Sequence, residues 1–266
     1  MPLPTNLGDF MAKKPIKLIA LSDTHCGHEL GLTPPAWENN KPSAKKQMRA
    51  AMWKWFKKTA GGMNPDIMIF NGDAIDGKGQ ASGGSEQLYM EWQDQVDMAE
   101  DVIKVVNPAA IYMSYGTAYH TGKDTDWERV LADQLSAKSI GGEDDLDVRG
   151  TVINYKHHLG RSGVPHGRTA AILRDALWNE IWAGRGEYPR AGILLRSHVH
   201  YHVFAGQPGL LALTLPSLQG YGTKYGGRRM TGTVDIGFVE FDFYGPNDYN
   251  WTTHIWRAPM KPVTKA

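Results

Sequence analysis

Short apolar runs with no polar alternation recur along this chain, and each predicts a β-strand that is buried on both faces. The runs lie at residues 16–21, 67–70, 110–115, 152–155, 193–195 and 211–215. A later segment, residues 233–241, alternates apolar and polar positions and predicts a further strand. Strands are therefore expected at intervals from residue 16 to residue 241.

Apolar positions at helical spacing lie between these runs and predict helices. The first stripe is Met48, Met52, Trp55 and Phe56. A second helix is expected to end at Asn107-Pro108, because the residue before a proline disfavours helical geometry. Its inner face is Leu88, Trp92, Val96, Ala99, Ile103 and Val106. Two further helices are predicted at residues 126–136 and 168–183. The last is expected to pack through Ile172, Ala176, Leu177, Ile181 and Trp182.

The composition is typical of a soluble globular protein. The chain has 266 residues, of which 41% are hydrophobic and 21% charged, and its formal net charge is +1. This balance allows a sizeable core and argues against a protein that coats nucleic acid by charge alone. Because we find neither an internal repeat nor a linker, we expect a single domain over residues 1–266, with residues 1–14 as a loose N-terminal arm.

Cysteine usage and apolar segments bear on the location of the protein. Cys26 is the only cysteine, so no intrachain disulfide can form, and a reducing compartment is expected. The sequence has no run of about 18 apolar residues, which excludes a membrane-spanning helix, and its first 14 residues lack the apolar stretch of a signal peptide. We therefore expect a cytoplasmic protein with no membrane partner, whereas the sequence leaves the oligomeric state open.

Five of the predicted strands end in side chains that can bind metal ions. The first runs into Asp23 and His25, and the alternation of side chains along an extended segment would point both the same way. One oxygen and one nitrogen donor suit a metal ion, although a turn capped by Asp23 would explain that pair alone. The later strand ends supply Asp73, then Thr117 or His120, then His157 or His158, and finally His198 and His200. Because ligands of open α/β sheets bind beyond the carboxyl ends of the strands, we expect these groups to form one site.

The order of these motifs resembles that of the calcineurin-like metallophosphoesterases. The resemblance covers residues 16–202 and rests on Asp23-Thr24-His25, Gly72-Asp73-Ala74-Ile75-Asp76, Gly116-Thr117, His157 and His198-Val199-His200. It implies an α/β fold, a four-layer α/β/β/α sandwich in which two mixed sheets face each other. We expect the earlier strands in one sheet, and the strands near residues 211–215 and 233–241 in the other.

The resemblance also implies roles for single residues. One metal ion would be held by Asp23, His25 and His200, and Asp73 would bridge to a second ion. The second ion would be held by His157 and His198, with His157 preferred over its neighbour His158. Asp76 would orient a ligand rather than bind metal. The implied cofactors are two divalent metal ions (Mn, Fe, Zn or Ni, with manganese favoured), which generate a hydroxide that attacks phosphorus.

One motif departs from the family pattern. The family usually has Gly-Asn-His here, with the asparagine as a metal ligand, whereas this chain has Gly116-Thr117-Ala118-Tyr119-His120. A neutral threonine hydroxyl is a poorer ligand than an amide oxygen. His120 could complete the shell of the second ion or act as the acid that protonates the leaving group, and we favour the acid. A structural role for His120 stays open.

The expected function is hydrolysis of phosphodiester bonds of the nucleotide or nucleic-acid type. The substrate partner would be a phosphate ester, and the reaction would be attack by a metal-bound hydroxide. Two alternatives stay open: a phosphomonoesterase of the same family, and a binding module that keeps the fold but has lost catalysis. Hydrolysis of a bond other than a phosphate ester is a less favoured third alternative.

Overall fold

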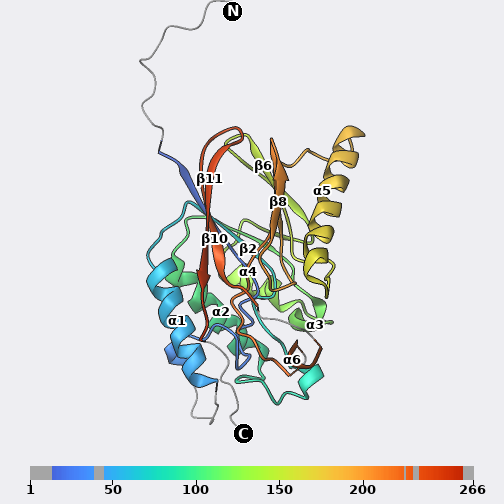
Figure 1. Cartoon of the computed structure of the whole chain (residues 1–266). Coiled ribbons are helices and arrows are strands. Elements are labelled where there is room, and N and C mark those ends of the chain that lie inside the picture. Colours follow the sequence, from blue (N-terminus) through green and yellow to red (C-terminus); the bar gives the residue numbers. More distant parts are fainter. Residues whose placement is uncertain (1–13, 39–44, 225, 230–233, 260–266) are drawn as a thin grey trace, which may run out of the picture.

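Two β-sheets face each other in this computed structural model, and helices cover their outer faces (Figure 1). The structure describes residues 14–38, 45–224, 226–229 and 234–259. The predicted N-terminal arm lies outside these residues, apart from Lys14. The four-layer α/β/β/α arrangement implied by the motifs is confirmed.

The first sheet has six strands in the order β11-β10-β1-β2-β3-β4. The strands β1 to β4 run parallel, and β10 pairs antiparallel with β1. In chain order the bounds are β1 Ile16–Leu21, β2 Ile67–Asn71, β3 Ile111–Ser114, β4 Ser139–Gly141, β10 Ile236–Gly245 and β11 Asp248–Trp256. The carboxyl ends of β1, β2 and β3 therefore lie at one edge of this sheet.

The second sheet has five strands in the order β5-β6-β7-β9-β8. Its central strands β6, β7 and β9 are parallel, and antiparallel strands β5 and β8 close its two edges. The bounds are β5 Asp144–Val148, β6 Thr151–Lys156, β7 Ile193–Arg196, β8 Phe204–Gln207 and β9 Leu210–Thr214. This sheet, like the first, is mixed.

Helices α1, α2 and α4 pack on the first sheet, and α5 packs on the second. Their bounds are α1 Lys46–Ala60, α2 Trp92–Val106, α4 Trp127–Gln134 and α5 Arg168–Gly184. Short helical segments lie in the loops: α3 Ala118–Thr121, α6 Gly226–Arg229, and the 3-10 turns Pro35–Trp37, Gln80–Ser82 and Pro165–Gly167. Among the described helices, none has the length and apolar character needed to cross a membrane.

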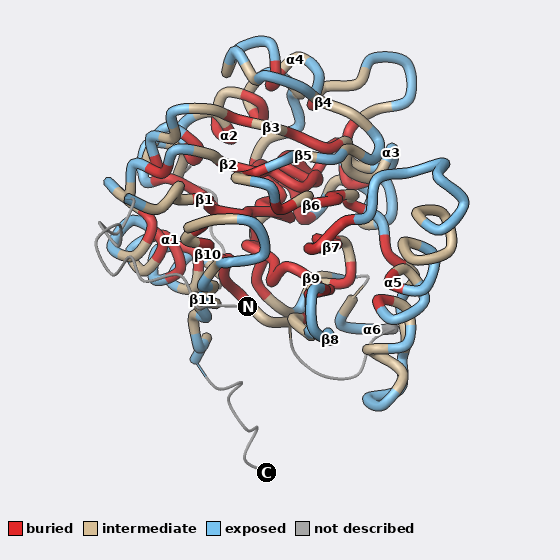
Figure 2. The backbone as a smooth tube through the Cα atoms, turned by 90° about the horizontal axis from the view of Figure 1, so that it is seen from above, coloured by how far each residue is buried: buried red, intermediate tan, exposed pale blue. Residues whose placement is uncertain are grey.

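The apolar runs show no alternation because both faces of the central strands are buried (Figure 2). In β1, Leu18 and Ala20 pack between the two sheets, whereas Ile19 and Leu21 pack against the helices of the first sheet. Removing apolar surface from water stabilises the folded state by about 25 cal/mol per Å², and both faces of each central strand contribute to this burial. The prediction of doubly buried strands is confirmed.

The predicted division of strands between the sheets is partly wrong. The predicted strand at residues 233–241 corresponds to β10, which joins the first sheet beside β1; residue 233 itself lies outside the described residues. Conversely, the earlier runs at residues 152–155 and 193–195 became β6 and β7 of the second sheet. An apolar run records that a strand is buried but carries no information about which strand it pairs with.

Two helix predictions also need correction. Leu88 precedes α2, which begins at Trp92, and its backbone amide donates to the carbonyl of Gly27 in a loop. Leu177 on α5 is 60% exposed, because α5 packs mainly through Ile172 and Ala176. The sequence did not predict β4, β5, β8 or β11, which lack long apolar runs because they lie at or next to sheet edges and have exposed faces.

Candidate metal centre

Left-handed backbone turns after the strands bring the candidate ligands together. Asp23, His25, Asp73, His198 and His200 have φ values of 51°, 43°, 53°, 71° and 56°. Non-glycine residues rarely adopt this region, and each such residue costs on the order of 1–3 kcal/mol. We expected extended geometry to point Asp23 and His25 the same way, and that reason is wrong because both residues lie beyond the end of β1. The two side chains nevertheless converge.

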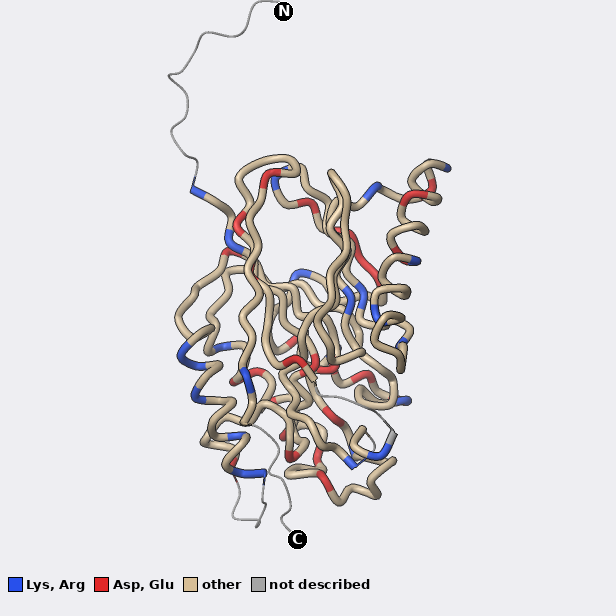
Figure 3. The backbone as a smooth tube through the Cα atoms, in the orientation of Figure 1, with Lys and Arg blue, Asp and Glu red and all other residues tan. Residues whose placement is uncertain are grey.

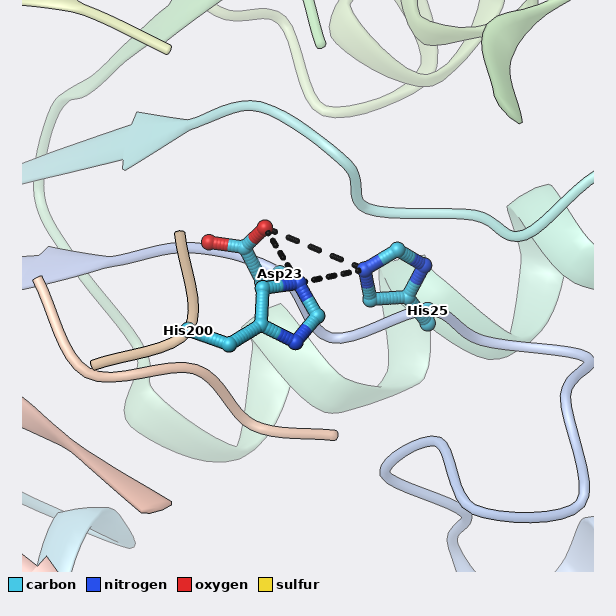
Figure 4. Close-up of side chains that lie close together, drawn as sticks. All are labelled: Asp23, His25 and His200. Carbon is cyan, nitrogen blue, oxygen red and sulfur yellow. Dashed lines mark hydrogen bonds and ion pairs between the residues drawn. The ribbon is translucent and has the colours of Figure 1, made fainter. Parts of the chain in front are cut away.

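The first cluster consists of Asp23, His25 and His200 (Figure 4). The Nε2 atom of His200 lies 3.1 Å from Oδ1 of Asp23 and 3.3 Å from Nε2 of His25. The Nε2 atom of His25 lies 3.8 Å from the same carboxylate oxygen. One carboxylate oxygen and two imidazole nitrogens, contributed by two distant parts of the chain, thus face one point.

The second cluster consists of Asp73, His157 and His198. The Nε2 atom of His157 lies 3.0 Å from Oδ2 of Asp73. The hydroxyl oxygen of Thr117 lies among all three side chains, at 3.3 Å from Oδ2 of Asp73, 3.5 Å from Nε2 of His157 and 3.2 Å from Nδ1 of His198. Thr117 is therefore within reach of the same point as these three donors.

Asp73 connects the two clusters. Its Oδ2 atom lies 4.0 Å from Nε2 of His25, and a third donor group consists of His25, Asp73 and His120. Within each of the three groups the ligand atoms lie within 4.8 Å of one another. The seven candidate site residues therefore lie together, and the sequence-based preference for His157 agrees with its burial at 1% exposure, whereas His158 is exposed.

Hydrogen bonds fix which imidazole nitrogen faces the centre. Nδ1 of His25 donates to Oδ1 of Asp76 at 2.9 Å, and Nδ1 of His157 donates to the carbonyl of Asn71 at 2.7 Å. These acceptors carry no proton, so Nε2 of both rings is the nitrogen available as a ligand. Asp76 thus orients His25, as expected from the sequence, without itself belonging to a donor cluster.

Charge in this centre is strongly concentrated. Burial alone would raise the pKa of Asp23 and Asp73, but His200 and His157 hold both well below their usual range. Burial alone would lower the pKa of His25 and His157, yet the carboxylates around them raise both to about 10. The carboxylates thus favour positive charge on the neighbouring groups, whether as protons or as metal cations.

The side chains of the centre could hold metal cations. Oδ1 of Asp23 is buried and, although Nε2 of His200 lies 3.1 Å away, accepts no hydrogen bond of good geometry in the described part of the chain, a costly arrangement that a cation would relieve. Nε2 atoms of His25 and His200 face each other at 3.3 Å, so at most one of these two nitrogens can carry a proton in the space between them. Mixed nitrogen and oxygen donors of this kind suit Mn, Fe, Zn or Ni.

Three further groups support the centre; Gly116 belongs to a motif named from the sequence, whereas the roles of Asn71 and Glu128 were not predicted. The Asn71 amide donates to Oγ of Ser197 at 2.7 Å and to the carbonyl of Lys156, which ties β2 of the first sheet to the second sheet. The buried carboxyl of Glu128 accepts hydrogen bonds from the amides of Ala74 and Gly116, and burial raises its pKa to about 8. A Cβ atom at Gly116 would lie 2.2 Å from Oδ1 of Asp73, so only glycine fits there.

Both donor clusters open into a cavity of about 1260 Å³. His120 lies in its wall, with Nδ1 donating to the carbonyl of Asp76 at 2.9 Å. The cavity is far larger than a phosphate group, and aromatic and basic side chains also line it. These residues include Tyr119, Arg161, Arg168, Tyr201, Tyr221, Trp256 and Arg257.

Comparison with known proteins gives similarity of fold only. No family model and no curated protein matches the chain. Vps29 of Chaetomium thermophilum has 10% identity and a TM-score of 0.48, over 92% of this chain and 100% of that chain. An archaeal phosphodiesterase has 15% identity and a TM-score of 0.46, over 90% and 99%. Vps29 of Entamoeba histolytica complexed with Zn²⁺ has 11% identity and a TM-score of 0.45, over 90% and 98%.

At such low identities and scores, these likenesses carry no argument about activity. We therefore base the function on the residues of this chain.

Proposed function

We propose that this chain is a calcineurin-like metallophosphoesterase that uses two divalent metal ions to hydrolyse phosphodiester bonds of the nucleotide or nucleic-acid type. The observation that carries the proposal is the pair of donor clusters joined by Asp73, built on strained turns after the strands. Strain of this kind persists where a site requires it, and core packing alone offers no reason to bury three carboxylates beside five imidazoles.

The donor atoms suggest how the ions would be held. Asp23, His25 and His200 would bind the first ion, His157 and His198 the second, and Asp73 would contact both. Bound divalent cations would supply Lewis acidity and lower the pKa of a coordinated water molecule. The chain itself supplies orientation, because hydrogen bonds already fix the rings of His25 and His157.

His120 is the candidate acid for the leaving group. Its Nδ1 donates to the carbonyl of Asp76, so the acid form is the ring protonated on both nitrogens, which gives the Nε2 proton to the departing oxygen and keeps the Nδ1 proton. The ring also makes an edge contact with His25, at 4.6 Å between the ring centroids, which keeps it beside the first donor cluster. Binding of metal by His120 is the alternative role, because its ligand atom also lies near His25 and Asp73.

The size and lining of the cavity favour a diester over a small monoester. A volume of about 1260 Å³ leaves room for a group on each side of phosphorus. Tyr119, Tyr221 and Trp256 in its walls offer faces on which nucleobases can stack. The phosphomonoesterase alternative requires only a small part of this space.

Hydrolysis of bis(p-nitrophenyl) phosphate with added Mn²⁺ tests the activity, and p-nitrophenyl phosphate tests the monoester alternative. We expect diester hydrolysis to exceed monoester hydrolysis, and Asp73→Asn to lower kcat at least about 100-fold because it weakens the contact with both ions. Asp248→Asn is a matched control, because Asp248 is exposed at the β10–β11 turn.

Two results would contradict this function. Activity that survives Asp73→Asn would place the reaction elsewhere, and Mn²⁺ binding without hydrolysis of any phosphate ester would favour the binding module.

A single domain is proposed as well, because β10 near the end of the chain returns to pair with β1. The cytoplasmic location stays a prediction from the single cysteine.

A further inference from the structure

A basic side chain from the helix that covers the second sheet lies in the cavity wall, over the chain segment that carries His200. Tyr201, the next residue along the chain, is 2% exposed and packs under α5 with Leu159 and Ile172. The guanidinium of Arg168, the first residue of α5, lies 4.7 Å above the centroid of the Tyr201 ring. Stacking on a buried ring restricts Arg168 to one place in the cavity wall.

Two properties of this place point to an anionic ligand. Arg168 has no carboxylate partner among the described residues, although it lines a cavity whose centre is rich in carboxylates. The hydroxyl of Tyr201 is buried and has no hydrogen-bond partner within the described ranges. A bound anion would give Arg168 a partner, and its oxygen atoms are acceptors that such a hydroxyl can use.

The end of α5 adds to this positive potential. The helix has 17 residues, and no side chain caps its start, although the amide of Arg168 donates to the carbonyl of Pro165. The helix dipole favours negative charge near this end. Figure 1 shows this end of α5 at the same end of the molecule as α3 and α6. A second arginine, Arg161, also lines the cavity. The positions of Lys and Arg in Figure 3 are otherwise spread over several elements, α1 among them.

We propose that Arg168, the first residue of α5, and Arg161, in the loop before this helix, bind a second phosphate group of the substrate. The inference rests on the proposed function and narrows it: the substrate is a nucleotide that carries a further phosphate besides the one attacked. A guanidinium binds a phosphate group through two parallel N–H bonds. A substrate with a single phosphate cannot accept these bonds, because that phosphate occupies the metal centre. The second phosphate belongs either to the next nucleotide of a chain or to a diphosphate.

Isothermal titration calorimetry on the full chain with Mn²⁺ tests this subsite. The probes are thymidine 5′-monophosphate, thymidine 3′,5′-bisphosphate and thymidine 5′-diphosphate. We expect the monophosphate to bind at least about tenfold more weakly than one of the other two. Tighter binding of the bisphosphate identifies a neighbouring nucleotide, and tighter binding of the diphosphate identifies a pyrophosphate group.

Arg168→Gln should abolish the preference and leave binding of the monophosphate unchanged. Arg161→Gln should reduce the preference in the same direction and serves as the second variant if Arg168→Gln does not fold. Arg174→Gln is the matched control, because Arg174 is exposed on the same helix and does not line the cavity. Equal binding of all three probes, or a preference that survives both substitutions, would overturn the proposal.

Failure of this inference can be told apart from failure of the proposed function. If the protein hydrolyses bis(p-nitrophenyl) phosphate but binds the three probes equally, the subsite is wrong and the phosphoesterase stands. If the arginine-dependent preference is found but no phosphate ester is hydrolysed, the subsite is correct and the protein binds its ligand without catalysis.

Discussion

The two halves of the metal centre are built differently. In the first half, Asp23 stands beside His25 and His200, and the carboxylate of Asp73 lies 4.0 Å from His25, so two carboxylates are within reach. Among the described residues, the second half has the carboxylate of Asp73 alone, with His157 and His198. In the second half, a neutral hydroxyl, that of Thr117, lies within 3.5 Å of donor atoms of Asp73, His157 and His198. Hydroxyl oxygen is a weak ligand for divalent cations and offers no charge. We therefore expect a cation to bind more tightly in the first half than in the second.

The turn after β7 gives the most direct way to test this difference. It carries His198 of the second half and His200 of the first, only two residues apart. We expect His200→Ala to lose the tighter ion and to lower kcat at least about 1000-fold, and His198→Ala to lose only the weaker ion with a loss of about 100-fold. Metal content after gel filtration, measured beside kcat, separates the two variants.

The wild-type chain is the reference for metal content, and thermal unfolding shows whether each variant keeps its fold. If both substitutions release both ions together, the two halves are one cooperative unit and do not differ in their affinity for metal.

Much of this centre could be predicted because its ligands follow buried strands. Apolar runs such as residues 16–21 and 67–70 mark the strands, and parallel strands place their carboxyl ends at one edge. The sequence correctly predicted that the side chains of Asp23 and His25 converge, but the reason given was wrong. A left-handed turn, and not the alternation of side chains along a strand, orients them. Residue identity therefore predicted the site better than backbone geometry did.

The rest of the site could not be read from single positions. Glu128 supports the turns of Ala74 and Gly116 from a helix far along the chain, and nothing in its sequence neighbourhood distinguishes it from a solvated glutamate. Arg168 and Tyr201 form a subsite only because α5 packs over β7 and β9. Tertiary packing alone brings such pairs together, as it also decides which sheet β10 joins.

Thr117→Asn should narrow the difference between the two halves. An amide oxygen is a better ligand than a hydroxyl, so we expect the weaker ion to bind at about tenfold lower Mn²⁺ concentration, with the tighter ion unchanged. Mn²⁺ titration followed by electron paramagnetic resonance measures both ions separately. Thr117→Val is the matched control, because it keeps the shape of the side chain and removes its oxygen. Tighter binding of the second ion by Thr117→Val would show that the hydroxyl obstructs the position instead of serving it.

The smallest effect is expected at the exposed neighbour of a ligand. His158 contacts the ring of His198 at 4.9 Å between centroids but contributes no atom to either donor cluster. His158→Gln should therefore change kcat and the affinity for the second ion by less than about threefold, as surface substitutions generally do. His157→Gln makes the same chemical change one residue earlier and should release the weaker ion, because Nε2 of His157 lies 3.0 Å from Oδ2 of Asp73. Mn²⁺ titration of both variants decides between the two histidines. If His158→Gln loses the second ion and His157→Gln keeps it, His158 is the ligand. The turn after β6 would then have to rotate.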